Sequence, residues 1–130
     1  MPPSAVRYAR VLAIDDSPEF LSILNVFFDA NPDLKLVGTA QNGREALRLV
    51  EELHPDLVLM DLQMAEMNGL EATSEIRSRF PEIEVVIVTA HDIPGLRQVC
   101  CDNGASDFIA KPRLHRELPD VLARFLARLN

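Results

Sequence analysis

Residues 56–61 read DLVLMD, four apolar side chains in succession with an acid on either side. Two similar runs occur elsewhere in the chain, RVLAIDD at residues 10–16 and EVVIVT at residues 84–89. A strand that is almost continuously apolar is typical of a parallel sheet covered on both faces. These three runs are therefore predicted to form the centre of a buried parallel sheet.

Segments of helical periodicity separate these runs and two weaker ones, the alternation of parallel strands with crossover helices. We predict an α/β fold, a flavodoxin-like doubly wound sheet of five parallel strands in the order 2-1-3-4-5 with five helices. The predicted strands are Arg10–Asp15, Lys35–Ala40, Asp56–Asp61, Glu84–Thr89 and Asp107–Lys111.

Residues that start and stop helices bound the intervening segments. Three helices are predicted to begin at N-capping residues and three to end before a proline; the starts are Ser17-Pro18, Asn42 and Asn68, and the ends are Asn31-Pro32, His54-Pro55 and Phe80-Pro81.

The last two helices are bounded by glycine and proline signals. The fourth helix is predicted to run from about Pro94 to Gly104, where glycine suits a left-handed cap. The fifth is predicted to begin near Arg116, because this start places Pro119 in the first turn, where no backbone donor is lost. Its sheet-facing residues would be Leu118, Val121, Leu122, Phe125 and Leu129.

Composition limits the class of protein. With 130 residues, 48% of them hydrophobic, the chain matches one compact domain, with no room for a second. A net charge of −7 argues against direct binding of nucleic acid and favours cations as small partners. Cys100 and Cys101 are adjacent, which suits neither a disulfide framework nor a CxxC metal site, so a reducing cytoplasm is expected.

The first residues have no apolar run long enough for a signal peptide or a membrane span. Residues 1–7 are expected to be a short flexible tail, and residues 8–130 a single domain without a membrane partner.

Polar groups stand where the predicted strands end. Asp15 and Asp16 follow the first strand, Asp61 closes the third, Thr89 the fourth and Lys111 the fifth. In an open parallel sheet, ligands bind outside the carboxyl ends of the strands, where the strand order reverses. Three converging carboxylates repel one another unless a hard cation neutralises them, and Mg²⁺ suits a site shared with a phosphate. The hydroxyl and the ammonium are phosphate-binding groups.

Each of these residues also has an ordinary structural explanation. Asp16 or Ser17 could cap the first helix, and the acid after the third strand could be a loop acid. Thr89 could be only a β-branched strand residue, and Lys111-Pro112 a solvated turn. Four successive strand ends that each supply a suitable group favour one joint site.

The sequence resembles the receiver (CheY-like) domains of bacterial two-component response regulators over nearly its whole length. The matching stretches are VLAIDDS at residues 11–17, DLVLMDLQM at 56–64, MNGL at 67–70, VTA at 88–90 and GASDFIAKP at 104–112.

The resemblance implies that Asp61 accepts a phosphoryl group from a histidine kinase or a histidine phosphotransfer protein. It implies a Mg²⁺ (or Mn²⁺) cofactor held by Asp16, Asp61 and the backbone carbonyl of Gln63, with Asp15 acting directly or through water. Lys111 would contact a phosphoryl oxygen, in keeping with phosphoryl transfer that depends on positioning and electrostatic stabilisation.

The resemblance also implies a switch. Thr89 would move toward the phosphoryl group and Phe108 into the vacated space, altering the surface of the fourth helix, fifth strand and fifth helix. Gln63 and His91 lie two residues beyond Asp61 and Thr89, where receivers set the lifetime of the phosphate. The alternative for His91 is an ordinary exposed loop histidine.

Three local features bear on this resemblance. Ala65 stands where many receivers have proline, which should loosen a loop without removing a ligand. Phe108 stands where tyrosine is frequent and has no hydroxyl, so its coupling to Thr89 must act through packing. The resemblance suggests a cis bond between Lys111 and Pro112, which proline permits.

The first helix carries more apolar side chains than one stripe can bury. Some should remain exposed, and Ile23 or Val26 could belong to a patch that docks a kinase, as receivers do beside this helix.

Other functions are less favoured by the residues. A hydrolase with an Asp nucleophile and Mg²⁺ would have a DxD arrangement, but Leu62-Gln63 follows Asp61. A phosphate-independent interaction module would not need the complete acceptor site. The domain is expected to be a switch, not an enzyme, apart from phosphotransfer to its own aspartate and slow autodephosphorylation. The output stays open between a separate protein target and a joined domain such as a helix-turn-helix, and a phosphorylation-dependent dimer is a further alternative.

Overall fold

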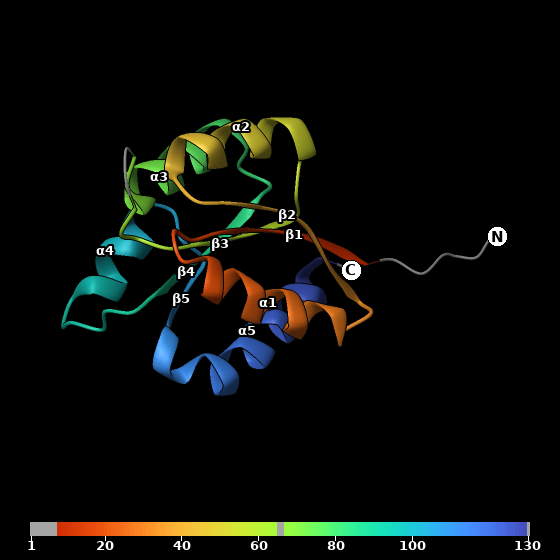
Figure 1. The fold of residues 1–130 in the computed structure, drawn as a ribbon. Helices are drawn as coiled ribbons and strands as arrows, with labels where there is room; N and C mark the ends of the chain where they lie inside the picture. The colour runs from red at the N-terminus through yellow and green to blue at the C-terminus, as the bar shows by residue number, and fades with distance from the viewer. Residues whose placement is uncertain (1–7, 65–66, 130) are drawn as a thin grey trace.

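The computed structural model of the protein describes residues 8–64 and 67–129, so the predicted tail 1–7 and the departure at Ala65 lie outside the described residues. The described residues alternate strand and helix along the chain (Figure 1). The strands are β1 (Ala9–Ile14), β2 (Leu34–Ala40), β3 (Leu57–Met60), β4 (Glu84–Thr89) and β5 (Asp107–Ala110). Each lies within one residue of its predicted bounds.

The strands form one parallel sheet in the order β2-β1-β3-β4-β5, which confirms the predicted flavodoxin-like topology. The order reverses between β1 and β3, which are neighbours, with Ile14 paired to Met60. At the same ends, Thr89 of β4 is paired to Ala110 of β5. The residues that follow these strands therefore meet at one edge of the sheet.

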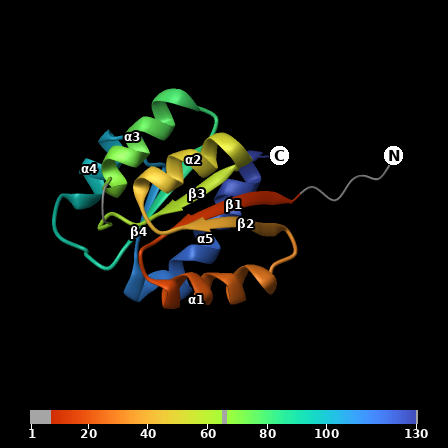
Figure 2. The ribbon, with the colours of Figure 1, turned by 45° about the horizontal axis from the view of Figure 1, so that its top comes forward.

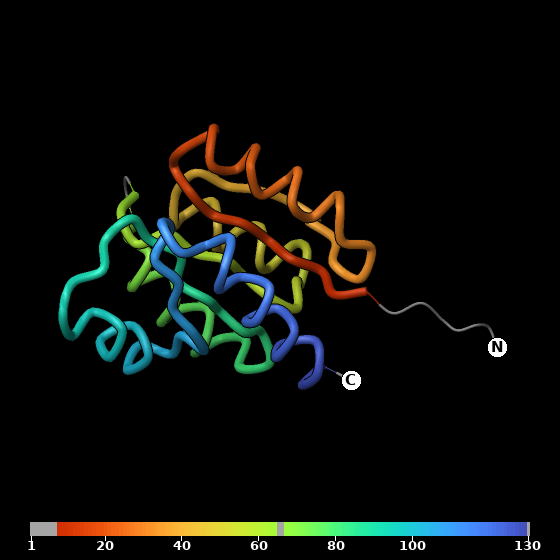
Figure 3. The backbone as a smooth tube through the Cα atoms, turned by 90° about the horizontal axis from the view of Figure 1, so that it is seen from below, coloured from red at the N-terminus to blue at the C-terminus, as the bar shows by residue number. Residues whose placement is uncertain are grey.

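Helices cover both faces of the sheet (Figures 1, 2 and 3). The helices are α1 (Pro18–Asp29), α2 (Gly43–Leu53), α3 (Gly69–Arg79), α4 (Leu96–Asp102) and α5 (Leu114–Leu129). Buried side chains of α1 and α5 share one apolar cluster with alternate residues of the strands, and those of α2, α3 and α4 share the other.

Strand β3 is apolar throughout because its side chains belong to both clusters. In β3, Leu57 and Leu59 belong to the cluster of α1 and α5, whereas Val58 and Met60 belong to the opposite one. Successive side chains of a strand point to opposite faces, so a strand buried on both faces has no position for a polar residue until it ends.

The predicted helix starts are confirmed at the three capping residues. Ser17 accepts a hydrogen bond from the backbone N–H of Phe20 at 3.2 Å, and Asn42 accepts one from Glu45 at 2.8 Å. Asn68 accepts one from Glu71 at 2.9 Å. A side-chain oxygen that takes up one of the free N–H groups fixes where a helix begins.

The last two helices begin elsewhere than predicted. Gly95 is left-handed, with φ of 85°, so α4 starts only at Leu96; Gly104, with φ of 106°, follows its end in the predicted left-handed conformation. A single 3₁₀ turn over Lys111–Arg113 leads directly into α5, which places Pro119 inside the helix and not in its first turn. Pro119 and His115 are both exposed, so the carbonyl that loses its donor can bind water.

The bond between Lys111 and Pro112 is trans, because no described peptide bond is cis, and the expectation of a cis bond was wrong. Pro112 lies in the 3₁₀ turn before α5, where its fixed φ fits the start of a helix.

Helix α1 has more apolar side chains than it can bury, as predicted. Leu21, Leu24 and Phe28 are buried, whereas Ile23 is 58% exposed and Val26 is 72% exposed. The docking role suggested for these two residues stays a prediction. None of the helices in the described part of the chain has the length and apolar character needed to cross a membrane.

Candidate functional site

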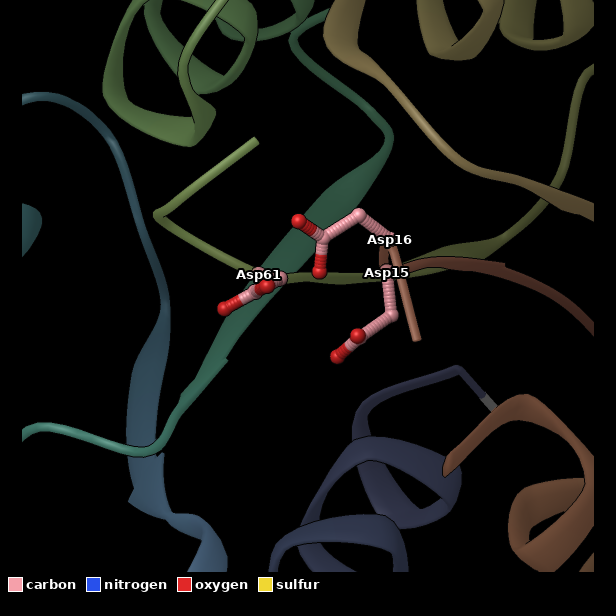
Figure 4. Close-up of side chains that lie close together, drawn as sticks. All are labelled: Asp15, Asp16 and Asp61. Carbon is pink, nitrogen blue, oxygen red and sulfur yellow. The ribbon is translucent and has the colours of Figure 1, made fainter. Parts of the chain in front are cut away.

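Three carboxylates converge where β1 and β3 end. One oxygen each from Asp15, Asp16 and Asp61 lies within 4.8 Å of the others (Figure 4). The backbone fixes this convergence, because the N–H of Asp61 donates to the carbonyl of Ile14 at 2.9 Å. Asp15 is 2% exposed and Asp61 is 6% exposed, whereas Asp16 is open to solvent. The cluster is thus a buried pair of acids with a third acid at its mouth.

Asp15 is held from two sides. Its Oδ1 accepts a hydrogen bond from the backbone N–H of Ser17 at 2.9 Å, and its Oδ2 lies 2.7 Å from Nζ of Lys111. The contact with Lys111 is a close ion pair that lacks hydrogen-bond geometry, so Oδ2 is a buried oxygen without a hydrogen-bond donor among the described residues. Such an oxygen can still coordinate a cation.

Asp61 is destabilised as an anion. Burial raises its pKa from 3.8 to about 6, and the charge of Asp15 adds to this effect. Lys111 and the N–H of Leu62, which donates to Oδ1 of Asp61 at 2.9 Å, act in the opposite direction but do not cancel it. The site therefore has a deficit of positive charge, which a divalent cation would remove.

Gly69, at the start of α3, lets the helix approach the end of β3. A Cβ at this position would overlap the carbonyl oxygen of Asp61. The N–H of Gly69 donates to the carbonyl of Leu62 at 3.0 Å, which holds the loop after Asp61 against the helix. The sequence indicated this glycine only as a helix start, because close approach of two backbones leaves no sign in one segment alone.

Thr89 and Phe108 are both buried, on the neighbouring strands β4 and β5. Thr89 is fully buried at the end of β4, and its Oγ1 accepts a hydrogen bond from the N–H of His91 at 3.3 Å. Phe108 is 1% exposed and is paired to Ile87 two residues before Thr89. The guanidinium of Arg97 lies 5.1 Å from the centre of the Phe108 ring and covers it from α4.

Gln63 and His91 meet beside the acids, although they come from different loops. Nε2 of His91 lies 2.9 Å from Oε1 of Gln63, a hydrogen bond between two exposed side chains. Both residues line a hollow of about 210 Å³ that Thr89 and Ile93 also line. The sequence placed each of them two residues after a site residue but could not show that they touch.

Phe20 lies beside the site, although the sequence marks it only as one of many apolar residues in the first helix. Its ring centre lies 4.3 Å from Nζ of Lys111, the same nitrogen that contacts Asp15. Its position four residues after Asp16 is the one sequence signal, and this spacing does not distinguish a core residue from a contact of the lysine.

Residues 11–123 match the family model of the response regulator receiver domain. The chain belongs to this family. A protein-glutamate methylesterase/protein-glutamine glutaminase of Treponema denticola is 40% identical over 79% of this chain and 28% of its own length. This chain therefore spans less than a third of that relative.

Solved receivers have the same fold. The response regulator domain of Thermotoga maritima CheB is 33% identical, with a TM-score of 0.83 over 93% of this chain and 96% of that one. A CheX-CheY-BeF3-Mg complex from Borrelia burgdorferi is 27% identical, with a TM-score of 0.81 over 94% and 90% of the two chains. The resemblance inferred from sequence is confirmed: this is a receiver domain of two-component signalling, a family of signalling switches.

The raised pKa of Asp61 predicts a pH-dependent loss of stability when divalent cations are removed. The pKa in the folded receiver, about 6, exceeds the ordinary value of 3.8, so stability falls as the pH rises through this interval. Asp61→Asn should remove the penalty and raise the free energy of unfolding by about 2 to 3 kcal/mol above about pH 7.

Urea unfolding in the presence of a chelator measures this effect. The advantage of the Asn variant should shrink toward zero near about pH 3, where the acid is protonated in both the folded and the unfolded state. An advantage of the same size at both pH values would show that Asp61 carries no such electrostatic cost.

Proposed function

We propose that residues 8–130 form a phosphoacceptor domain in which Asp61 takes a phosphoryl group from a histidine kinase or a histidine phosphotransfer protein. The observation that carries the proposal is the meeting of three carboxylates within 4.8 Å, next to an ammonium 2.7 Å from one of them. A buried carboxylate inside a site that can hold a cation and a phosphate is suited to acyl phosphate formation.

The donor set fits Mg²⁺ (or Mn²⁺), a hard cation that prefers oxygen ligands. Asp15, Asp16 and Asp61 would hold the ion together with the backbone carbonyl of Gln63. The charge deficit at Asp61 supports this assignment, as does the buried Oδ2 of Asp15, which is paired with the Lys111 ammonium but has no hydrogen-bond donor among the described residues. When bound, the cation supplies positive charge to the oxygens of the transferring phosphoryl group.

Each of the protein groups would have a separate role in the transfer. A carboxylate oxygen of Asp61 attacks phosphorus, the bond from phosphorus to the donor histidine breaks, and its electron pair leaves with the imidazole nitrogen. Lys111 neutralises charge on one phosphoryl oxygen, and the hydroxyl of Thr89 donates a hydrogen bond to another. The reaction needs only positioning and fixed charge, which a rigid sheet edge provides.

We further propose that Thr89 and Phe108 carry the signal to the surface of α4, β5 and α5. Movement of Thr89 toward the phosphoryl group vacates space that Phe108 can enter. Asp107, the neighbour of Phe108, joins the three elements, because its carboxylate lies 3.5 Å from Arg97 of α4 and 2.8 Å from Arg124 of α5. The population shift cannot exceed the differential stabilisation that the phosphate gives.

The output of the switch is proposed to lie outside the residues of this domain. A downstream protein or a joined output domain would read the α4-β5-α5 surface, and a phosphorylation-dependent dimer would use the same surface. The methylesterase named for the Treponema relative makes such a catalytic domain one candidate output, because the chain spans 28% of that protein. The activity proposed for the receiver itself is transfer to Asp61 followed by slow autodephosphorylation.

Incubation with acetyl phosphate and Mg²⁺ should add the mass of one phosphoryl group to the intact protein, as measured by mass spectrometry. Asp61→Asn should abolish the adduct, because the amide is not a nucleophile of comparable strength. Asp33→Asn is the matched control, since Asp33 is an exposed acid before β2, at the opposite edge of the sheet. A phosphorylated Asp61→Asn variant would place the acceptor elsewhere.

The hydrogen bond between Gln63 and His91 should slow hydrolysis of the acyl phosphate, since the two side chains line the hollow beside Thr89. Loss of one hydrogen bond corresponds to a dephosphorylation rate increased by about threefold to tenfold. We expect this increase in Gln63→Ala and in His91→Ala, and no further increase in the double variant, because both changes break the same contact.

Release of inorganic phosphate from the purified phosphoprotein measures these rates. Ile93→Ala, which widens the same hollow without removing a hydrogen bond, serves as the control. An unchanged rate in His91→Ala would make His91 an ordinary loop histidine.

A further inference from the structure

The lysine of the acceptor site has an aromatic partner. Nζ of Lys111 lies 4.3 Å from the centre of the Phe20 ring and 2.7 Å from Oδ2 of Asp15. We propose that Phe20 is a positioning residue for phosphotransfer, and that the face of its ring holds the Lys111 ammonium at the rim of the acid cluster. This inference rests on the function proposed above for Asp61 and Lys111.

The physical basis is a cation–π contact in a partly desolvated place. The ring face carries a negative quadrupole, which attracts an ammonium within about 6 Å of the centroid. The attraction is stronger where water is excluded, and the side chain of Lys111 is only 22% exposed. A lysine has a long flexible stem, so a second fixed partner limits the positions that its charge explores.

The ring is itself fixed by the residues that build the site. The N–H of Phe20 donates to Oγ of Ser17 at 3.2 Å, and the N–H of Ser17 donates to Oδ1 of Asp15 at 2.9 Å. Phe20, Ser17, Asp15 and Lys111 thus form a closed circuit of contacts. The start of α1, the first strand end and the fifth strand end are held in one geometry by this circuit.

Packing explains the location of the ring but not its orientation toward a charge. Phe20 and Phe27 are both partly buried on α1 and pack against the same apolar cluster. Phe27 meets another ring, Phe28, edge to face at 5.2 Å, as core aromatics do, whereas Phe20 presents its ring to Lys111. Leucine at position 20 would fill much of the same space but would offer no π face.

The initial rate of Asp61 phosphorylation by acetyl phosphate and Mg²⁺ tests this role of Phe20. Phe20→Leu should slow the reaction by about threefold to tenfold, the factor that corresponds to one half-buried cation–π contact. Phe20→Tyr should react at the wild-type rate because it keeps the aromatic ring face. Phe27→Leu, the same substitution on the same helix, should leave the rate unchanged.

Beryllofluoride affinity, followed by ¹⁹F NMR, shows whether Phe20 acts through Lys111. Phe20→Leu should weaken binding in the wild-type background and have no further effect in a Lys111→Ala background, since the partner of the ring is then gone.

Three results would overturn the inference: a wild-type rate in Phe20→Leu, equal slowing in Phe20→Leu and Phe20→Tyr, or an undiminished effect on affinity without Lys111. Equal slowing would assign Phe20 a packing role only. A wild-type protein that is never phosphorylated would instead refute the proposed function, so the two failures are distinguishable.

Discussion

Two buried acids at adjacent strand ends impose the main constraint on this receiver. Because Ile14 is paired to Met60 in the sheet, the residues that follow, Asp15 and Asp61, cannot separate without breaking the register of β1 and β3. Burial and mutual repulsion raise the pKa of Asp61 to about 6, and one ammonium does not compensate for it. The folded protein thus has a local deficit of positive charge at the place where a phosphoryl group would bring more negative charge.

The surrounding residues hold the two acids in place or contact them directly. Gly69 lets α3 reach the loop after Asp61, and the capping Ser17 donates its N–H to Asp15 while starting α1. Lys111 reaches the acids from β5 and is met from α1 by Phe20. Elements distant in the chain therefore contribute fixed charges and dipoles, which would need little rearrangement during the proposed phosphoryl transfer; preorganisation of this kind lowers a barrier.

The fold was predictable from sequence because its signals are local. Apolar runs followed by polar residues predicted most of the strands and their carboxyl ends, and capping residues such as Asn42 predicted helix starts. The predicted start of α5 was wrong. A helix tolerates Pro119 in its interior only if the carbonyl of His115 can bind water, and exposure of His115 is a property of the tertiary structure. The contact of Phe20 with Lys111 could not be predicted either, since it depends on the direction of two side chains from opposite ends of the chain.

Amide NMR spectra recorded during addition of Mg²⁺ and then beryllofluoride test the central claim most directly. If the acids form one cation and phosphate site, Mg²⁺ should shift the resonances of Asp15, Asp16 and Asp61 together, and beryllofluoride should then shift those of Thr89 and Phe108. Shifts confined to exposed acids elsewhere on the surface, with these resonances unmoved, would contradict the account.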